Sequence, residues 1–434
     1  MAYFSERTLA LKPPVMGTLL RSIIPVVIGI GVALLLQFAF RPIAGDYWSK
    51  ITLDICTNII LAVSLTMVNG FTGQFSIGHA AFMAIGAYAS ACIVYYGSMH
   101  AFGDARVHGG LLSTMRQDHG GPLISGGDLI FVGSLLVGGL VAALCGYLVG
   151  LPSLRLKGDY LAIVTLGFGE IVRLIITAKT RDVIYSAEEV VKAPIYELPL
   201  HLGGGLGFSG LPFYTSLFWV GLFASLTLIV AYRLKQSTYG RAFLSIREDE
   251  IAAEAMGINT TRYKVQAFVF AAFFAGIGGG LFAHTFGVQL NPGELGFIKS
   301  FDILILVVIG GLGSISGATI AAIVLTSVPE LLREPRSVWP WGVIGAVVVA
   351  SAMAAVSRRK LTPFLMLGGV CVGWELLRFG AAEAGINLAE YRMVLYALVL
   401  ILMMILRPEG LMGLSEIWDL RWGGRSRGAA KGAT

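Results

Sequence analysis

Polar side chains occur inside long apolar stretches of this 434-residue chain. Residues 69–91 read NGFTGQFSIGHAAFMAIGAYASA and place Gln74, Ser76 and His79 among closely spaced glycines. A polar side chain in hydrocarbon costs free energy unless it faces a cavity or a hydrogen-bonding partner. This stretch therefore predicts a tightly packed or partly unwound segment. Its polar atoms either hydrogen-bond to neighbouring helices or contact a transported solute.

A second polar group lies in residues 158–174, which read GDYLAIVTLGFGEIVRL. Glu170 and Arg173 are three residues apart, so on a helix they share one face and neutralise each other. The pair has either a structural role or a place on a polar pathway. Thr165 in the same segment and Asp302 in a later apolar segment complete the candidate translocation path.

Other patterns in the sequence argue against an enzyme. The chain contains no GxxxxGK[ST] phosphate loop, so we expect that it does not hydrolyse ATP by itself. GGGLGFSG at 203–210 has GxGxxG spacing but follows a proline-containing loop instead of a strand. His108, Asp118 and His119 lack the spacing of a metal site. We predict no catalytic residue, no bound metal and no bound cofactor.

The elements that hold these residues must be membrane helices. Hydrophobic residues make up 56% of the chain and form long runs, some of which approach the roughly 20 residues that span a bilayer. We therefore predict an all-α, polytopic bundle of about ten spanning helices. The expected apolar segments are 22–40, 51–69, 75–96, 129–151, 160–178, 214–232, 266–286, 301–327, 341–356, 362–380 and 393–406. The net charge of +6 is explained by cytoplasmic loops, and no nucleic-acid partner is expected.

Lys and Arg residues predict the orientation of the bundle. The basic tail 1–21 is placed in the cytoplasm, and the loop 233–265 then lies on the same side. With one crossing per segment, Arg358-Arg359-Lys360 and the C-terminal tail 414–434 would lie outside. One segment must therefore turn back within the membrane, which returns both basic regions to the cytoplasm.

The segment expected to turn back is 301–327, because GGLGSISG interrupts it at 310–317. Each apolar half has about a dozen residues and is too short to span a bilayer. Broken helices at membrane depth require surrounding protein or a water-filled cavity, so the break indicates a transport path. A glycine-rich packing contact between helices is the alternative. The predicted break comprises Gly310, Gly311, Gly313 and Gly317.

The loop 233–265 concentrates charge in an otherwise apolar chain, at RAFLSIREDEIAAEAMGINTTRYK, residues 241–264. Ser245 and Glu248 have the spacing of a capping box, which predicts that a helix starts at Ser245. Gly257 is expected to end this helix.

The same helix is predicted to be amphipathic. Ile251, Ala255 and Ile258 recur at helical spacing, while Glu250 and Glu254 line a polar face. An apolar stripe on a cytoplasmic loop indicates a surface that meets another protein. An ordinary solvated loop helix is the alternative.

Five stretches together resemble the permease subunits of bacterial ABC importers for branched-chain amino acids. They are NGFTGQFSIGHAAFMAIGAY, GDYLAIVTLGFGEIVR, REDEIAAEAMGINTTRYKVQAFVFAAFFAGIGGGL, ILVVIGGLGSISG and RPEGLMG. The resemblance covers most of 50–330 and again 388–413. It implies that residues 22–413 form an inner-membrane permease domain, which provides half of a path for branched-chain or related amino acids. Residues 335–387 are expected to be an inserted helical hairpin.

The resemblance also implies partners. These are a second similar permease, two cytoplasmic ATPases that bind ATP and Mg²⁺, and a periplasmic binding protein that delivers the solute. In the family, a short cytoplasmic helix with the EAA motif docks on the ATPase. Gly257 matches the glycine of that motif and Ala252-Ala253 its alanines, whereas Ile251 occupies the position of its glutamate. The implied coupling helix contains Arg247, Glu248, Glu250, Ala252, Ala253, Glu254 and Gly257.

Two alternatives stay open at this point. Permeases for urea or short amides share these motifs, so the cargo is not fixed by the resemblance. A stand-alone secondary transporter or channel would show inverted repeats or a coupling-ion site of buried acids, for which Glu170 and Asp302 are the candidates.

Overall fold

The computed structural model describes residues 15–113, 122–153, 159–285 and 288–331, together with 394, 397, 401, 405, 410–413 and 416. The predicted insertion at 335–387 lies outside these residues. Within the described ranges the chain forms helices and one isolated β-bridge, between Phe208 and Leu290, and no strand. The all-α prediction is confirmed for this part of the chain.

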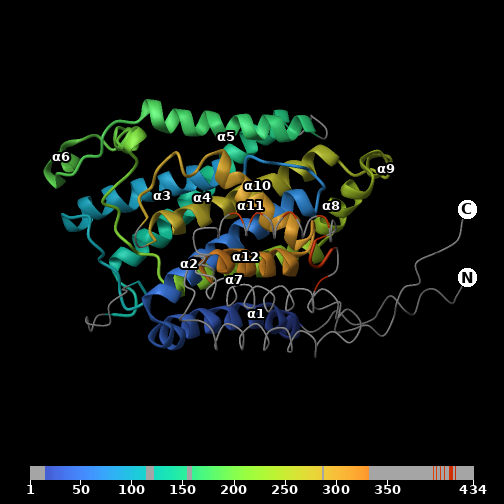
Figure 1. Cartoon of the computed structure of the whole chain (residues 1–434), viewed down its shortest axis with the longest axis horizontal. Coiled ribbons are helices and arrows are strands. Elements are labelled where there is room, and N and C mark those ends of the chain that lie inside the picture. The colour runs from blue at the N-terminus through green and yellow to red at the C-terminus, as the bar shows by residue number, and fades with distance from the viewer. Residues whose placement is uncertain are drawn as a thin grey trace, which may run out of the picture.

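The helices pack side by side along the long axis of the molecule, with α5 along one edge and α1 along the other (Figure 1). Their bounds are α1 (Val15–Leu35), α2 (Arg41–Leu65), α3 (His79–Phe102), α4 (Gly126–Ser153), α5 (Asp159–Lys179), α6 (Ala187–Lys192), α7 (Leu217–Gln236), α8 (Thr238–Glu248), α9 (Glu250–Ala255), α10 (Thr260–Ala283), α11 (Phe297–Gly310) and α12 (Ile315–Leu331). Because α1 already begins at Val15, it includes part of the tail predicted at 1–21.

Six helical stretches of the described residues are long and apolar enough to cross a membrane. They are Ile23–Gly70, His79–Phe102, Gly126–Pro152, Tyr160–Lys179, Leu217–Gln236 and Thr260–Ala283. The first stretch joins α1 to α2, and Gly45 interrupts it with a φ of 74°. The total of about ten spanning helices stays a prediction, since three expected segments lie wholly or largely outside the described residues.

Contacts between helices give their relative directions. Gln37, just after α1, accepts a hydrogen bond through its side-chain Oε1 from the N–H of Phe218, at the start of α7. Just beyond the end of α2, the Phe71 ring lies 5.7 Å from the Nζ of Lys235, near the opposite end of α7. α1 and α2 therefore run in opposite directions, and the chain reverses near Gly45, as the predicted topology requires.

Small residues bring α3, α4 and α10 together as the core of the bundle. A Cβ atom added at Gly86 of α3 would overlap the backbone of Gly276 in α10, and one at Gly138 of α4 would lie 2.8 Å from the Gly86 carbonyl oxygen. Ser90 and Ser134 form a buried hydrogen bond of 2.8 Å between α3 and α4. Close backbone approach and buried hydroxyl pairs are typical of helix packing in lipid.

Candidate translocation path

The backbone between α2 and α3 leaves the helical conformation inside the bundle. A π-helical turn ends α2 at Gly70, and α3 begins only at His79. The side chain of Asn69 pairs with the intervening segment, because its Oδ1 accepts from the Ser76 N–H at 3.2 Å and its Nδ2 donates to the Ser76 carbonyl at 3.3 Å. The predicted unwound entry into α3 is therefore confirmed.

Two predicted path residues hold the start of α3 in place. Thr165 of α5 accepts a hydrogen bond at its Oγ1 from the Ile77 N–H at 3.1 Å. The Nε2 of His79 lies 2.8 Å from the Oγ of Ser64 on α2. Both side chains are buried, and their hydrogen bonds supply the neighbouring partners that one of the two predicted roles requires.

Gln74 lies in the same non-helical segment and differs from these residues. Its side chain is only 7% exposed, and neither its Oε1 nor its Nε2 has a hydrogen-bond partner among the described residues. Leaving a buried polar group unpaired costs about 1–3 kcal/mol. A water molecule or a polar solute beside Gln74 would remove that cost.

Glu170 and Arg173 form the predicted ion pair, with 2.8 Å between Glu170 Oε2 and Arg173 Nε. Each side chain keeps about one third of its surface exposed, at 36% and 33%. The pair borders the start of α11, because a Cβ atom at Gly296 would lie 2.9 Å from Arg173 Cδ. Asp302 on α11 is exposed and does not hydrogen-bond to this pair.

The predicted break in segment 301–327 is confirmed, at residues 311–314 between α11 and α12. Gly311 and Gly313 have φ values of 109° and 97°, a backbone conformation that residues other than glycine rarely adopt. Two of the four glycines predicted in the break lie in helices instead: Gly310 is the last residue of α11, and Gly317 lies inside α12, where it packs against the backbone of Gly310. Both glycines allow the close approach of the two helices, so the prediction is wrong for these two residues.

α11 and α12 form a hairpin whose tip, residues 311–314, lies beside the end of α2. A Cβ atom at Gly70 would lie 2.6 Å from the Gly313 nitrogen. At the far end of α12, the Tyr47 hydroxyl donates to Glu330 Oε2 at 2.8 Å. Tyr47 is near the start of α2, so α12 runs antiparallel to α2.

Glu416 caps the N-terminus of α12 from a distant part of the chain. Its carboxylate accepts hydrogen bonds from the N–H groups of Ile315 at 3.0 Å and Ser316 at 2.9 Å, and from Lys235 Nζ at 2.5 Å. Lys235 Nζ also donates to the Gly313 carbonyl at 2.8 Å. Burial raises the pKa of Glu416, but these hydrogen bonds outweigh it and hold the pKa below its usual value. A carboxylate also suits the positive end of the helix dipole.

Arg247 of α8 reaches both non-helical segments. One guanidinium NH group donates to the Gly70 carbonyl at 2.7 Å and makes a longer contact of 3.5 Å with the Leu312 carbonyl. Gly73, with a φ of 69°, packs on the same side chain, since a Cβ atom there would lie 3.1 Å from Arg247 Cγ. Sequence reasoning placed Arg247 on the coupling helix but missed these contacts.

The loop between α7 and α10 contains two helices where one was predicted. α8 starts at Thr238, because the Ser237 hydroxyl caps it by accepting from the Gly240 N–H at 3.2 Å. Ser245 lies inside α8, and its hydroxyl donates to the Arg241 carbonyl at 2.9 Å. The predicted helix start at Ser245 is therefore wrong, because the earlier serine takes the capping role.

α9 is separated from α8 by Asp249, whose extended backbone has a φ of −158°. The Asp249 carboxylate caps α9 by accepting from the N–H groups of Ile251 at 2.9 Å and Ala252 at 3.0 Å. α9 ends at Ala255, and Gly257 follows with a φ of 86°. The prediction that this glycine ends the helix is confirmed.

The two faces of α9 have different partners. Glu250 forms an ion pair of 2.6 Å with Lys264 of α10, and Glu254 accepts a hydrogen bond of 2.7 Å from the Thr260 hydroxyl. Both acids therefore attach α9 to the bundle. The opposite surface is apolar and open, with Ile251 73% exposed. Ala252 and Glu248 are also exposed, whereas Ala253 is buried.

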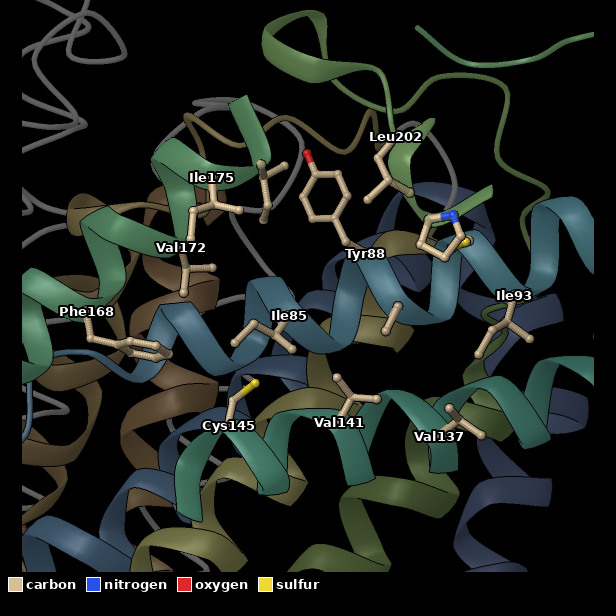
Figure 2. A pocket seen from close by; sticks show the side chains of 14 residues that line it. Ile85, Tyr88, Ile93, Val137, Val141, Cys145, Phe168, Val172, Ile175 and Leu202 are labelled. Atoms are coloured by element: carbon tan, nitrogen blue, oxygen red, sulfur yellow. The ribbon is translucent and has the colours of Figure 1, made fainter. Parts of the chain in front are cut away.

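A separate apolar groove lies between α3, α4 and α5 (Figure 2). It has a volume of about 560 Å³ and is lined by aliphatic and aromatic side chains, among them Ile85, Val141, Phe168 and Val172. None of the described residues that line the groove is charged, so its lining is apolar in character. Among the described residues, no group of three or more His, Cys, Asp or Glu side chains could hold a metal.

Comparisons with known proteins identify the family. The family model described as "Branched-chain amino acid transport system / permease component" matches residues 47–406. The "High-affinity branched-chain amino acid transport system permease protein LivM" of Salmonella typhimurium is 35% identical over 313 residues, and its Escherichia coli K12 counterpart is 36% identical over 313. Each alignment covers 66% of this chain and 64% of the relative.

A more distant relative is the "Probable branched-chain amino acid transport permease protein LivM" of Methanocaldococcus jannaschii. It is 26% identical over 311 residues, which cover 66% of this chain and 81% of the relative. No solved structure matches the chain. The family match spans most of the sequence and includes both non-helical segments, the ion pair of α5 and the α8–α9 loop. The chain therefore belongs to the branched-chain amino acid transport system permease family.

Proposed function

We propose that the chain is the transmembrane permease subunit of an ATP-driven importer for branched-chain or related amino acids in a bacterial inner membrane. Its partners would be a second permease of the same family, two cytoplasmic ATPases and a periplasmic binding protein. ATP and Mg²⁺ would bind to the ATPases, and this chain would supply half of the path. The names of the LivM relatives support this cargo.

The observation that carries the proposal is the pair of adjacent non-helical segments, 71–78 and 311–314, within an apolar helical bundle. Such backbone is tolerated at membrane depth only where protein or a water-filled cavity surrounds it. In transporters with broken helices, the exposed helix ends contact the polar groups of the solute. The proposed path residues are Gln74, Ser76, His79, Thr165, Glu170 and Asp302.

The ion pair on α5 has the chemistry to meet an amino acid. Arg173 donates to Glu170 through its Nε. Its two terminal NH groups have no partner among the described residues, and neither has the second carboxylate oxygen of Glu170. A zwitterion presents a carboxylate for the guanidinium and an ammonium for the glutamate. We infer that the pair faces the path and exchanges contacts with the passing solute.

The α8–α9 loop is proposed as the contact with an ATPase. The exposed apolar surface of α9 favours a protein partner over water. In this arrangement the loop and both chain termini lie in the cytoplasm, and the α11–α12 hairpin is re-entrant. Closure of the ATPases would push α8 and α9, and the bundle would alternate between outward and inward openings.

The test is reconstitution of the chain in proteoliposomes with its partner permease, ATPases and binding protein. We expect ATP-dependent uptake of labelled leucine that isoleucine and valine compete away. The matched control is the same complex with the phosphate-loop lysine of the ATPase replaced. Uptake of urea without leucine would overturn the cargo, and uptake that persists without ATP would make the chain a secondary transporter or channel.

A further inference from the structure

We propose that Arg247 is the positioning residue that transmits movement of the α8–α9 loop to the two non-helical segments of the path. The proposal rests on the proposed function, because it takes this loop as the contact with an ATPase. It adds a specific mechanical connection between that contact and the path.

Arg247 is the point where three separate parts of the chain meet. Its guanidinium donates to the carbonyl of Gly70, at the end of α2, and contacts that of Leu312, in the hairpin tip. Its aliphatic part packs against Gly73, in the segment before α3. Any displacement of the last turn of α8 therefore acts directly on both segments.

The accepting groups are suited to this role. Gly70 ends a helix and Leu312 lies between two helices, so their carbonyls point at partners outside the regular helical ladder. Carbonyls at a helix end also carry partial negative charge, which favours a cation there. A planar guanidinium with several donors can hold two carbonyls at once, which an ammonium group does less well.

The rest of α8 packs against α10. Phe243 and Ile246 are buried, and the Phe243 ring lies 6.1 Å from the Tyr263 ring of α10 in an edge-on contact. α9 is also attached to α10, through the ion pair between Glu250 and Lys264. A push on α9 is thus delivered to α8 and the start of α10 together, and Arg247 carries it to the tip.

The other cation at the tip serves a different element. Lys235 belongs to α7 and binds the Gly313 carbonyl and the buried carboxylate of Glu416. It fixes one side of the tip to α7 and to the C-terminal segment. Arg247 contacts the carbonyl of the preceding residue, Leu312, from α8. A shift of α8 relative to α7 would therefore move Leu312 relative to the N-terminus of α12, which Glu416 caps.

The test measures how many solute molecules are transported per ATP hydrolysed by the reconstituted complex. Arg247→Gln removes the charge, Arg247→Lys keeps it, and Arg241→Gln is the matched control. Arg241 lies on the same helix and is exposed, and among the described residues its side chain hydrogen-bonds only to the Thr238 hydroxyl, at 3.2 Å. Assembly and basal ATP hydrolysis are measured on the same preparations.

We expect Arg247→Gln to assemble and hydrolyse ATP while its transport per ATP falls about tenfold or more. Arg247→Lys should recover part of the ratio, and Arg241→Gln should match the unsubstituted complex. A normal ratio in Arg247→Gln, or an equal fall in Arg241→Gln, overturns the inference. If Arg247→Gln fails to assemble, Arg247→Lys decides: a ratio below normal supports the inference and a normal ratio overturns it. Failure of the unsubstituted complex to transport refutes the proposed function instead.

Discussion

Ile251 shows how one residue can change the chemistry of a docking surface. It occupies the motif position where the family resemblance leads one to expect an acid, and its side chain is 73% exposed on α9. The neighbouring acid, Glu250, is engaged with Lys264 and faces the bundle. Contact with the ATPase would therefore depend on burial of Ile251 and of Met256, which is 82% exposed, instead of on a salt bridge.

We predict that Ile251→Lys weakens association with the ATPase by about tenfold or more. Burying an isoleucine contributes about 1.5–3 kcal/mol, and a lysine in its place cannot be buried without a partner. The measurement is the amount of ATPase that co-purifies with the permease from detergent-solubilised membranes. Arg262→Gln, at an exposed position beyond α9, should leave co-purification unchanged. Equal recovery of ATPase with Ile251→Lys would show that this side chain is not at the contact.

Exchanging the two charges of the α5 ion pair distinguishes a structural role from contact with the solute. Glu170→Gln and Arg173→Gln should each lower uptake, but a structural role would give the same result. The double variant Glu170→Arg with Arg173→Glu restores an ion pair at the same spacing with its charges reversed. We predict normal membrane levels and no recovery of amino-acid uptake in the double variant. Recovery of uptake would assign the pair a structural role only.

At the scale of the element, the hairpin tip depends on one buried carboxylate. We predict that Glu416→Gln lowers the free energy of unfolding by about 1.5–3 kcal/mol at pH 7, because it removes the charged partner of Lys235 and weakens the cap of α12. The measurement is thermal unfolding of the purified chain in detergent. The matched control is Glu248→Gln, since Glu248 is exposed at the end of α8.

The effect of Glu416 should also depend on pH. Its folded-state pKa lies below the ordinary value of 4.5, so the stabilisation is complete above that value and is lost as the pH falls through the lower folded-state pKa. The difference in stability between the unsubstituted chain and Glu416→Gln should therefore shrink on acidification below about pH 4.5. A difference that stays constant into acid would contradict an ionised cap.

Local sequence patterns correctly predicted the features that neighbouring residues determine. The glycine cluster at 310–317 indicated the break, and the spacing of Glu170 and Arg173 indicated their ion pair. The predicted helix start at Ser245 was wrong because the helix already begins after Ser237, whose hydroxyl caps it. The pairing of Glu416 with α12 was missed because 100 residues separate it from Ser316, and no local pattern reports so distant a partner.

For the whole molecule, the arrangement of the helices makes the proposed orientation testable. α6 lies at one end of the long axis, and α8 and α9 lie at the other (Figure 1). The hairpin tip adjoins α8 through Arg247. Because the tip adjoins α8, which leads directly into α9, we expect Leu312 and Ile251 to lie on the same side of the membrane, opposite α6.

Single cysteines in a background without the four native cysteines test this orientation with a membrane-impermeant thiol reagent. We predict that Tyr196→Cys is labelled in intact cells, because Tyr196 is 78% exposed in the segment after α6. Ile251→Cys and Leu312→Cys should be labelled only in inside-out vesicles. Labelling of Ile251→Cys and Tyr196→Cys from the same side would refute the proposed topology.

The distant cap of α12 has a consequence for how the chain is made. Because Glu416 lies about a hundred residues beyond the first turn of α12, which it caps, a ribosome that adds roughly 5 to 20 residues per second needs about 5 to 20 seconds between the two. During that interval the N-terminus of α12 lacks its carboxylate and Lys235 lacks its counter-ion. The tip is thus completed only after synthesis has passed Glu416, and a chain cut short before that residue would form α12 without the carboxylate that caps it.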